Sequence, residues 1–245
     1  MTTTPETPAS PPHISRRDAP NSIQGPAGRL EIGVQSGRNS SNRNVARPVA
    51  ILAHPHPLYG GDMDNAVVRR TAQRLEEHGF DTVRFNFRGV GNSDGAHDGG
   101  QGEIADLAAV FQWSRSHFHE ATVLLAGYSF GAATILRSEP LEGVRAVLLI
   151  APPLSFYDLS KAPMTTSFGD HSGATPVALI YGGNDELTAA PHREQTKAWR
   201  PRTTEELPSV GHDLGAAGSA EQRLRFDAAV DRCLDALSMS SEGTA

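Results

Sequence analysis

Short apolar runs alternate with longer amphipathic segments along the chain, and this pattern predicts a sheet covered by helices on both faces. Four runs of strand length are almost continuously apolar, at residues 48–53, 121–126, 144–151 and 176–181. A strand that is buried on both faces has this composition, whereas a strand with one solvent face alternates. Further strands are predicted at 28–34, as a weakly alternating edge strand, and at 81–87 and 203–207; helical spacing occurs at 64–78, 103–118, 189–199 and 220–238. The sequence therefore predicts an α/β fold with a mostly parallel central sheet.

The length of the chain predicts one domain. Its 245 residues, 38% of them hydrophobic, are enough for a single sizeable core. Residues 1–24 are rich in Thr, Pro and Ser and are predicted to be a disordered leader to a domain at 25–240. The polar segment 36–47 is interpreted as a flexible hairpin loop. Residues 152–175 separate two predicted strands by too short a stretch for a large cap domain.

Charge and composition exclude several classes of protein. The formal net charge is −6, and no dense run of Lys and Arg is present, so a general nucleic-acid partner is not expected. No segment is apolar enough to span a bilayer, and the N-terminus lacks the apolar core of a secretory signal, so the sequence predicts a cytoplasmic protein without a membrane partner. The single cysteine, Cys233, rules out an internal disulfide and is interpreted as a core residue of the last helix. The sequence leaves the oligomeric state open.

The pentapeptide Gly-Tyr-Ser-Phe-Gly at 127–131 is the strongest chemical signal. It follows the apolar run 121–126 and precedes small residues at 132–136, a strand–turn–helix context that makes Ser129 a candidate nucleophile. A second Gly-x-Ser-x-Gly lies at 91–95, among polar and turn residues with no helix of small residues directly after it. Because context decides such matches, the second copy is interpreted as a loop beside the site.

A serine nucleophile needs a histidine base and usually a carboxylate that orients this base. On a doubly wound sheet the expected order along the chain is Ser, acid, His. Asp185 follows the run 176–181, and His212 follows the predicted strand 203–207, so both lie at the predicted sheet edge in the required order. The rival residues are Glu186 for the acid, and His171 and His192 for the base; the first histidine precedes the acid strand and the second lies on a predicted helix.

Two backbone N–H groups are expected to form an oxyanion hole. One belongs to Phe130, the residue after the nucleophile, and the other to the loop after the run 48–53. Prolines 55 and 57 lack an N–H group, which leaves three donors, His56, Leu58 and Tyr59. His56 or Leu58 is favoured, and the sequence does not decide between them.

Neither a metal nor a cofactor is expected. A metal site could be imagined from His54 and His56 with Asp62 and Asp64, but the interleaved prolines stiffen this loop and no third histidine is near in sequence. His54 is interpreted as a structural residue that packs under the site. Four apolar residues, Phe156, Tyr157, Met164 and Phe168, either form a wall for an acyl group or belong to a packed loop.

Taken together, these motifs resemble the α/β-hydrolases, in particular the small, lidless bacterial members with a His-Pro-His-Pro-Leu-Tyr-Gly-Gly signature. The matching pieces are residues 25–31, 54–61, 85–93, 127–131 and 150–153, within about 25–215. The resemblance implies an α/β-hydrolase fold without a large cap and a serine hydrolase that cleaves an ester or related acyl bond of a small-molecule substrate. Peptidase or thioesterase activity is compatible with it. The alternative is a protein that kept this fold for binding or for a non-hydrolytic reaction.

Overall fold

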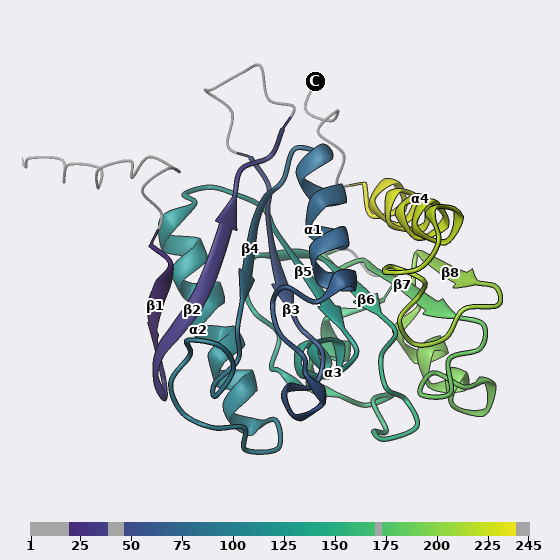
Figure 1. Cartoon of the computed structure of the whole chain (residues 1–245), viewed down its shortest axis with the longest axis horizontal. Helices are drawn as coiled ribbons and strands as arrows, with labels where there is room; N and C mark the ends of the chain where they lie inside the picture. The colour runs from purple at the N-terminus through teal and green to yellow at the C-terminus, as the bar shows by residue number, and fades with distance from the viewer. Residues whose placement is uncertain (1–19, 39–46, 170–172, 239–245) are drawn as a thin grey trace, which may run out of the picture.

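Eight strands form one sheet in the computed structural model of the protein, which describes residues 20–38, 47–169 and 173–238 (Figure 1). The strands are β1 (Ser22–Gly25), β2 (Gly28–Gln35), β3 (Val49–Ala53), β4 (Asp81–Phe85), β5 (Val123–Tyr128), β6 (Val144–Ile150), β7 (Val177–Gly182) and β8 (Thr203–Leu207). Their spatial order is β1-β2-β4-β3-β5-β6-β7-β8. β1 and β2 pair antiparallel with their neighbours, and the strands from β4 to β8 are parallel. The predicted mostly parallel sheet is confirmed.

Helices cover both faces of this sheet (Figure 1). They are α1 (Ala66–Glu77), α2 (Gln101–His117), α3 (Phe130–Arg137) and α4 (Ala220–Ala236), with 3-10 segments η2 (Pro57–Tyr59), η3 (Pro163–Ser167) and η4 (Ala190–Trp199). Alternate residues of the central strands point to opposite faces: Leu52 belongs to the core that includes α1 and α4, and Ile51 to the core that includes α2 and α3. Two separate cores explain why these strands are apolar along their whole length. Cys233 is buried in the core under α4, as predicted.

The N-terminal part differs from the sequence prediction in two respects. β1 begins at Ser22, inside the range 1–24 that was predicted to be disordered, because Ile23 is buried and pairs with Leu30. A strand of four residues carries too little pattern to be recognised in a polar context. β1 also covers β2, so the predicted edge strand is the second strand of the sheet. Residues 1–19 of the predicted leader lie outside the described residues.

The predicted hairpin at 36–47 is wrong in its pairing. β2 pairs with β4, which comes after β3 in the chain, so the segment does not join two neighbouring strands. Residues 39–46 of this segment lie outside the described residues.

Among the described residues, no helix is both long enough and apolar enough to cross a membrane.

The topology creates one place where loops diverge. After β3 the chain crosses to β4 on one side of it, and after β4 it crosses to β5 on the other side. The carboxyl ends of β3 and β5 therefore flank a switch point, which is where ligands bind in open α/β sheets. The loop after β3 and the pentapeptide after β5 meet at this point, as expected from the sequence.

Candidate active site

Ser129 occupies a sharp turn between β5 and α3. Its backbone has φ 54° and ψ −115°, in a region that non-glycine residues rarely adopt, and its N–H donates to the carbonyl oxygen of Ile150 at 2.8 Å. The flanking glycines are required by space: a Cβ at Gly127 would lie 2.6 Å from the backbone nitrogen of Ala132, and one at Gly131 would overlap the carbonyl oxygen of Ala53. The turn thus has the strained geometry of a nucleophile elbow.

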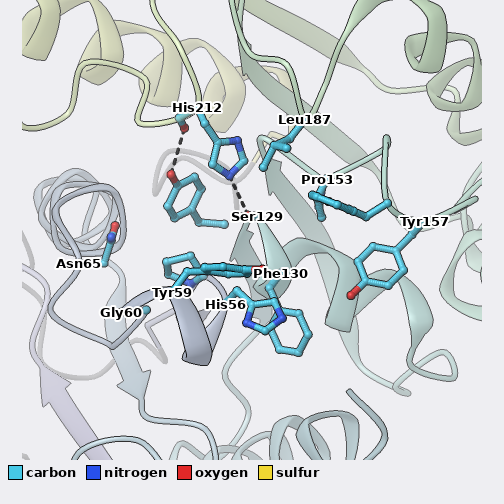
Figure 2. Close-up of a pocket in the computed structure, with 14 residues that line it drawn as sticks. His56, Tyr59, Gly60, Asn65, Ser129, Phe130, Pro153, Tyr157, Leu187 and His212 are labelled. Atoms are coloured by element: carbon cyan, nitrogen blue, oxygen red, sulfur yellow. Dashed lines mark hydrogen bonds between the residues drawn. The ribbon is translucent and has the colours of Figure 1, made fainter. Parts of the chain in front are cut away.

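His212 lies between Ser129 and Asp185, and Figure 2 shows its contact with Ser129. The Nε2 atom of His212 is 2.7 Å from Ser129 Oγ, and its Nδ1 atom is 2.9 Å from Asp185 Oδ2. An ionised carboxylate only accepts hydrogen bonds, so Nδ1 carries the proton and the lone pair of Nε2 faces the serine hydroxyl. The structure thus brings together the three residues that the sequence singled out.

Asp185 is fixed by more than its contact with His212. Its Oδ1 atom accepts the Leu187 N–H at 2.9 Å, and its Oδ2 atom also accepts the hydroxyl of Thr188 at 3.0 Å. Burial, the largest influence, acts to raise the pKa of the Asp185 carboxyl, but these hydrogen bonds together with His212 outweigh it and hold the pKa below its ordinary value. Asp185 is therefore ionised at neutral pH. The rival Glu186 is exposed.

Of the two rival histidines, only His192 can be placed. It lies on η4 and is half-buried, and none of the hydrogen bonds found among the described residues joins its ring to Ser129 or Asp185. His171 lies outside the described residues. The order along the chain therefore agrees with the geometry in pointing to His212.

Tyr128 contacts His212 in two ways that the sequence did not reveal. Its hydroxyl donates to the carbonyl oxygen of His212 at 3.0 Å, and the two rings lie 5.3 Å apart between centroids. Burial and the carboxylates of Asp185 and Asp213 raise the pKa of the Tyr128 phenol, which keeps the hydroxyl protonated as a donor. Tyr128 is the variable residue of Gly-x-Ser-x-Gly, so only the fold could relate it to a loop more than eighty residues away.

Of the three candidate oxyanion donors in the loop after β3, one has an N–H group that makes no hydrogen bond within the described residues. The N–H of Leu58 donates to His56 Nδ1 at 3.2 Å, and the N–H of Tyr59 donates to the carbonyl oxygen of His56 at 3.1 Å. Among the hydrogen bonds of the described residues, the N–H groups of His56 and Phe130 have no acceptor. His56 and Phe130 both line the pocket that contains Ser129.

The two histidines of this loop have different surroundings. His54 is fully buried; its Nδ1 lies 2.6 Å from the carbonyl oxygen of Pro55, and its Nε2 accepts the N–H of Phe87 at 3.0 Å. Burial lowers the pKa of His54 to about 4, so its ring is neutral. Both nitrogens are engaged, in agreement with a structural role. Across the residues the structure describes, no group of three or more His, Cys, Asp or Glu side chains could hold a metal ion.

His56 packs against His97, a histidine that no motif of the sequence indicates. The rings of His56 and His97 are 4.8 Å apart between centroids, and His97 Nδ1 lies 2.8 Å from the buried carboxylate of Glu103. Desolvation and the neighbouring His97 lower the pKa of His56. A neutral His56 keeps the Nδ1 lone pair that accepts the Leu58 N–H. The pairing depends on a loop and a helix that lie about forty residues further along the chain.

The second Gly-x-Ser-x-Gly has a structural role in the hydrogen bonding of β2. Ser93 is buried, and its hydroxyl donates to the carbonyl oxygen of Asn86 at 2.7 Å and accepts the N–H of Glu31 at 2.9 Å. No residue of 91–95 lines the pocket that contains Ser129. The prediction of a loop is confirmed, but its contacts are with β2 and with Asn86, directly after β4, and not with the pocket.

A pocket of about 450 Å³ opens at Ser129. Its lining consists of Pro55, His56, Tyr59, Gly60, Gly61, Asn65, Tyr128, Ser129, Phe130, Pro153, Phe156, Tyr157, Leu187 and His212. Among the four apolar residues whose role the sequence left open, Phe156 and Tyr157 line this pocket, whereas Met164 and Phe168 are buried in the core. Leu58, one of the two favoured oxyanion donors, is exposed and is not part of the lining.

Comparison with known proteins agrees with this architecture. The family model of the alpha/beta hydrolase fold matches residues 58–171. A serine hydrolase homologue from Coxiella burnetii is 30% identical, with a TM-score of 0.72 over 87% of this chain and 94% of that one. A serine hydrolase without a lid from Xanthomonas campestris is 29% identical, with a TM-score of 0.74 over 91% and 95% of the two chains. An uncharacterised protein of Rickettsia prowazekii is 34% identical over 69% of this chain and 67% of its own. The chain belongs to the α/β-hydrolase family.

Proposed function

We propose that the protein hydrolyses a carboxylic ester or a related acyl bond of a small molecule through Ser129, His212 and Asp185. The observation that carries this proposal is the 2.7 Å contact between Ser129 Oγ and His212 Nε2 inside an open pocket. The Ser129 hydroxyl attacks the acyl carbonyl while Nε2 takes its proton, and Asp185 stabilises the imidazolium that forms. His212 then protonates the leaving group.

The second half of the reaction uses the same groups. An acyl group remains on Ser129 Oγ after the leaving group departs, and a water molecule attacks it while His212 takes the proton of the water. The bond between Oγ and the acyl carbon then breaks, the carboxylic acid leaves, and His212 returns the proton to Oγ. The negative oxygen of each tetrahedral intermediate is placed between the N–H groups of Phe130 and His56. The free N–H of His56 supports this choice over Leu58, whose N–H already donates to the His56 ring.

The proposal is tested by active-site labelling and a substrate panel. A fluorophosphonate is expected to label one serine per chain, which peptide mass analysis assigns to Ser129. Turnover of 4-nitrophenyl butyrate and of the matching thioester is expected to exceed that of the 4-nitroanilide, because an amine leaves only after it is protonated. Absence of both labelling and turnover would refute a serine hydrolase. Labelling without turnover of any panel member would instead favour the binding or non-hydrolytic alternative.

The assignment of the second oxyanion donor yields a mutational prediction. His56 has φ −59°, which proline can adopt, so His56→Pro removes both the ring and the N–H, whereas His56→Ala removes the ring alone. We expect kcat of His56→Pro to be about 10²–10³-fold below that of His56→Ala, as for other lost oxyanion donors. Stopped-flow or steady-state ester hydrolysis measures this ratio, and circular dichroism checks the folding of both variants. Equal kcat values would transfer the role to Leu58.

A further inference from the structure

The lining of the pocket carries no formal charge unless His56 or His212 is protonated. None of its 14 lining residues is Lys, Arg, Asp or Glu. A charged substrate group in this pocket would lose hydration without gaining a counter-ion, which is costly. The net charge of −6 further disfavours anions. The pocket is therefore suited to an uncharged substrate.

Lining residues lie on two sides of Ser129, which we call two arms of the pocket (Figure 2). The apolar arm contains Pro153, Tyr157 and Leu187, and Phe156, the neighbour of Tyr157 in the chain, also lines the pocket. Phe156 is 69% exposed there, so a hydrophobic substrate group that covers its ring would bury apolar surface. Asn65 and Gly60 lie on the opposite side of Ser129 in Figure 2. An ester held at Ser129 would extend one of its two substituents into each arm.

Asn65 is the one amide side chain of the lining, and its orientation is fixed by the start of α1. Its Oδ1 atom accepts the N–H of Val67 at 2.9 Å as the helix N-cap. Because Val67 donates this bond, the oxygen of the amide must face the helix and the Nδ2 group is the free end. Asn65 lines the pocket, and both N–H groups of its Nδ2 atom are left without an acceptor among the described residues.

We propose that Asn65 is a specificity-determining residue that donates a hydrogen bond to a neutral oxygen acceptor of the substrate, such as an ether or carbonyl oxygen. The substrate class is then an uncharged ester with a hydrophobic group in the apolar arm and the acceptor in the arm of Asn65. This inference rests on the proposed ester hydrolysis at Ser129.

Matched esters test the inference in both orientations. In the first pair, hexyl pentanoate and hexyl 3-methoxypropanoate, one CH₂ group of the acyl chain is replaced by an ether oxygen. In the second pair, butyl hexanoate and 2-methoxyethyl hexanoate, the same replacement is made in the alcohol chain. We expect kcat/KM of the ether ester to exceed that of its partner by about 3- to 10-fold in one of the two pairs, the range of a neutral hydrogen bond. Monohexyl succinate, an anion of similar length, is expected to react at least about 10-fold more slowly than hexyl pentanoate, because its carboxylate would be desolvated.

Two substitutions remove the amide donor but keep a capping side chain. Asn65→Asp and Asn65→Ser both retain an oxygen that can accept the Val67 N–H, so the start of α1 is preserved. In each variant, the ratio of kcat/KM between the ether ester and its CH₂ partner is expected to fall to about one. Gln73→Glu, at an exposed position of the same helix, adds the same charge as Asn65→Asp and is expected to leave this ratio unchanged.

The results separate the inference from the function on which it rests. The role of Asn65 would be overturned if both Asn65 variants still preferred the ether ester. It would also be overturned if the unsubstituted protein hydrolysed the two esters of each pair with equal kcat/KM. Equal rates for monohexyl succinate and hexyl pentanoate would overturn the selection of uncharged substrates. If none of the five esters is hydrolysed, the proposed function fails instead.

Discussion

Replacement of Ser129 by alanine is expected to abolish fluorophosphonate labelling and to lower kcat for esters by at least about 10⁴-fold. The substitution removes the only hydroxyl that lies within hydrogen-bond distance of His212 Nε2 among the described residues. An alanine at this position would adopt the positive φ of the elbow, as the serine does, so the fold is expected to persist. Labelling is read by intact mass, and kcat by release of 4-nitrophenolate.

Ser93 offers a matched control within the same pentapeptide pattern. Ser93→Ala leaves the N–H of Glu31 and the carbonyl oxygen of Asn86 without their partner, which is expected to cost about 1–3 kcal/mol in the free energy of unfolding. Its labelling and kcat below the melting transition are expected to match those of the unsubstituted protein. If Ser129→Ala were still labelled, or if Ser93→Ala lost its labelling while folded, the nucleophile would have been assigned wrongly.

Replacement of Asp185 by asparagine is expected to lower kcat by about 10³–10⁴-fold. The Leu187 N–H requires an acceptor at the Oδ1 position, so the amide oxygen of the introduced asparagine would take that place and its NH₂ group would face His212 Nδ1. The ring would then carry its proton on Nε2, the nitrogen that should accept the serine proton. Because substrate contacts are unchanged, KM is expected to change far less than kcat.

The exposed neighbour Glu186 provides the comparison for this substitution. Glu186→Gln removes the same charge next to the same loop and is expected to leave kcat within about twofold, since surface charges of this kind have small effects. ¹H NMR of the histidine ring protons would show the change of tautomer in Asp185→Asn alone. A kcat for Asp185→Asn within about tenfold of the unsubstituted protein would mean that another group orients His212.

The apolar strands and the strand–turn–helix pattern of the elbow could be predicted because both are visible in neighbouring residues. The apolar composition of β5 and the close approach of Gly127 to Ala132 act over a few residues. The need for glycine at 131 has a different origin, because a Cβ there would overlap the carbonyl oxygen of Ala53, at the end of the distant strand β3. The strand β1 could not be predicted in this way. Ile23 is buried only because β2 turns back beside it, and four residues give too short a pattern.

In the loop after β3, the choice of the candidate oxyanion donor likewise could not be predicted from local sequence. The sequence excluded Pro55 and Pro57 as donors but left His56 and Leu58 open, because both have an N–H group. The choice depends on the rotamer of the His56 ring, which accepts the Leu58 N–H and packs on His97 and Phe130. Those contacts come from a loop and a helix distant in the chain, and no local pattern records them.

The sequence by itself determined the class of fold, the candidate nucleophile and the order of its candidate partners, because the hydrophobic period, the pentapeptide and the order of residues are properties of the chain. Only the tertiary structure decided the distances among Ser129, His212 and Asp185, the contact of Tyr128 with His212, and the free amide of Asn65 in a pocket without formal charge. These features arise where separate strand ends meet. Hydrogen bonds of this kind depend on positions to within a fraction of an ångström, which packing of the whole sheet sets.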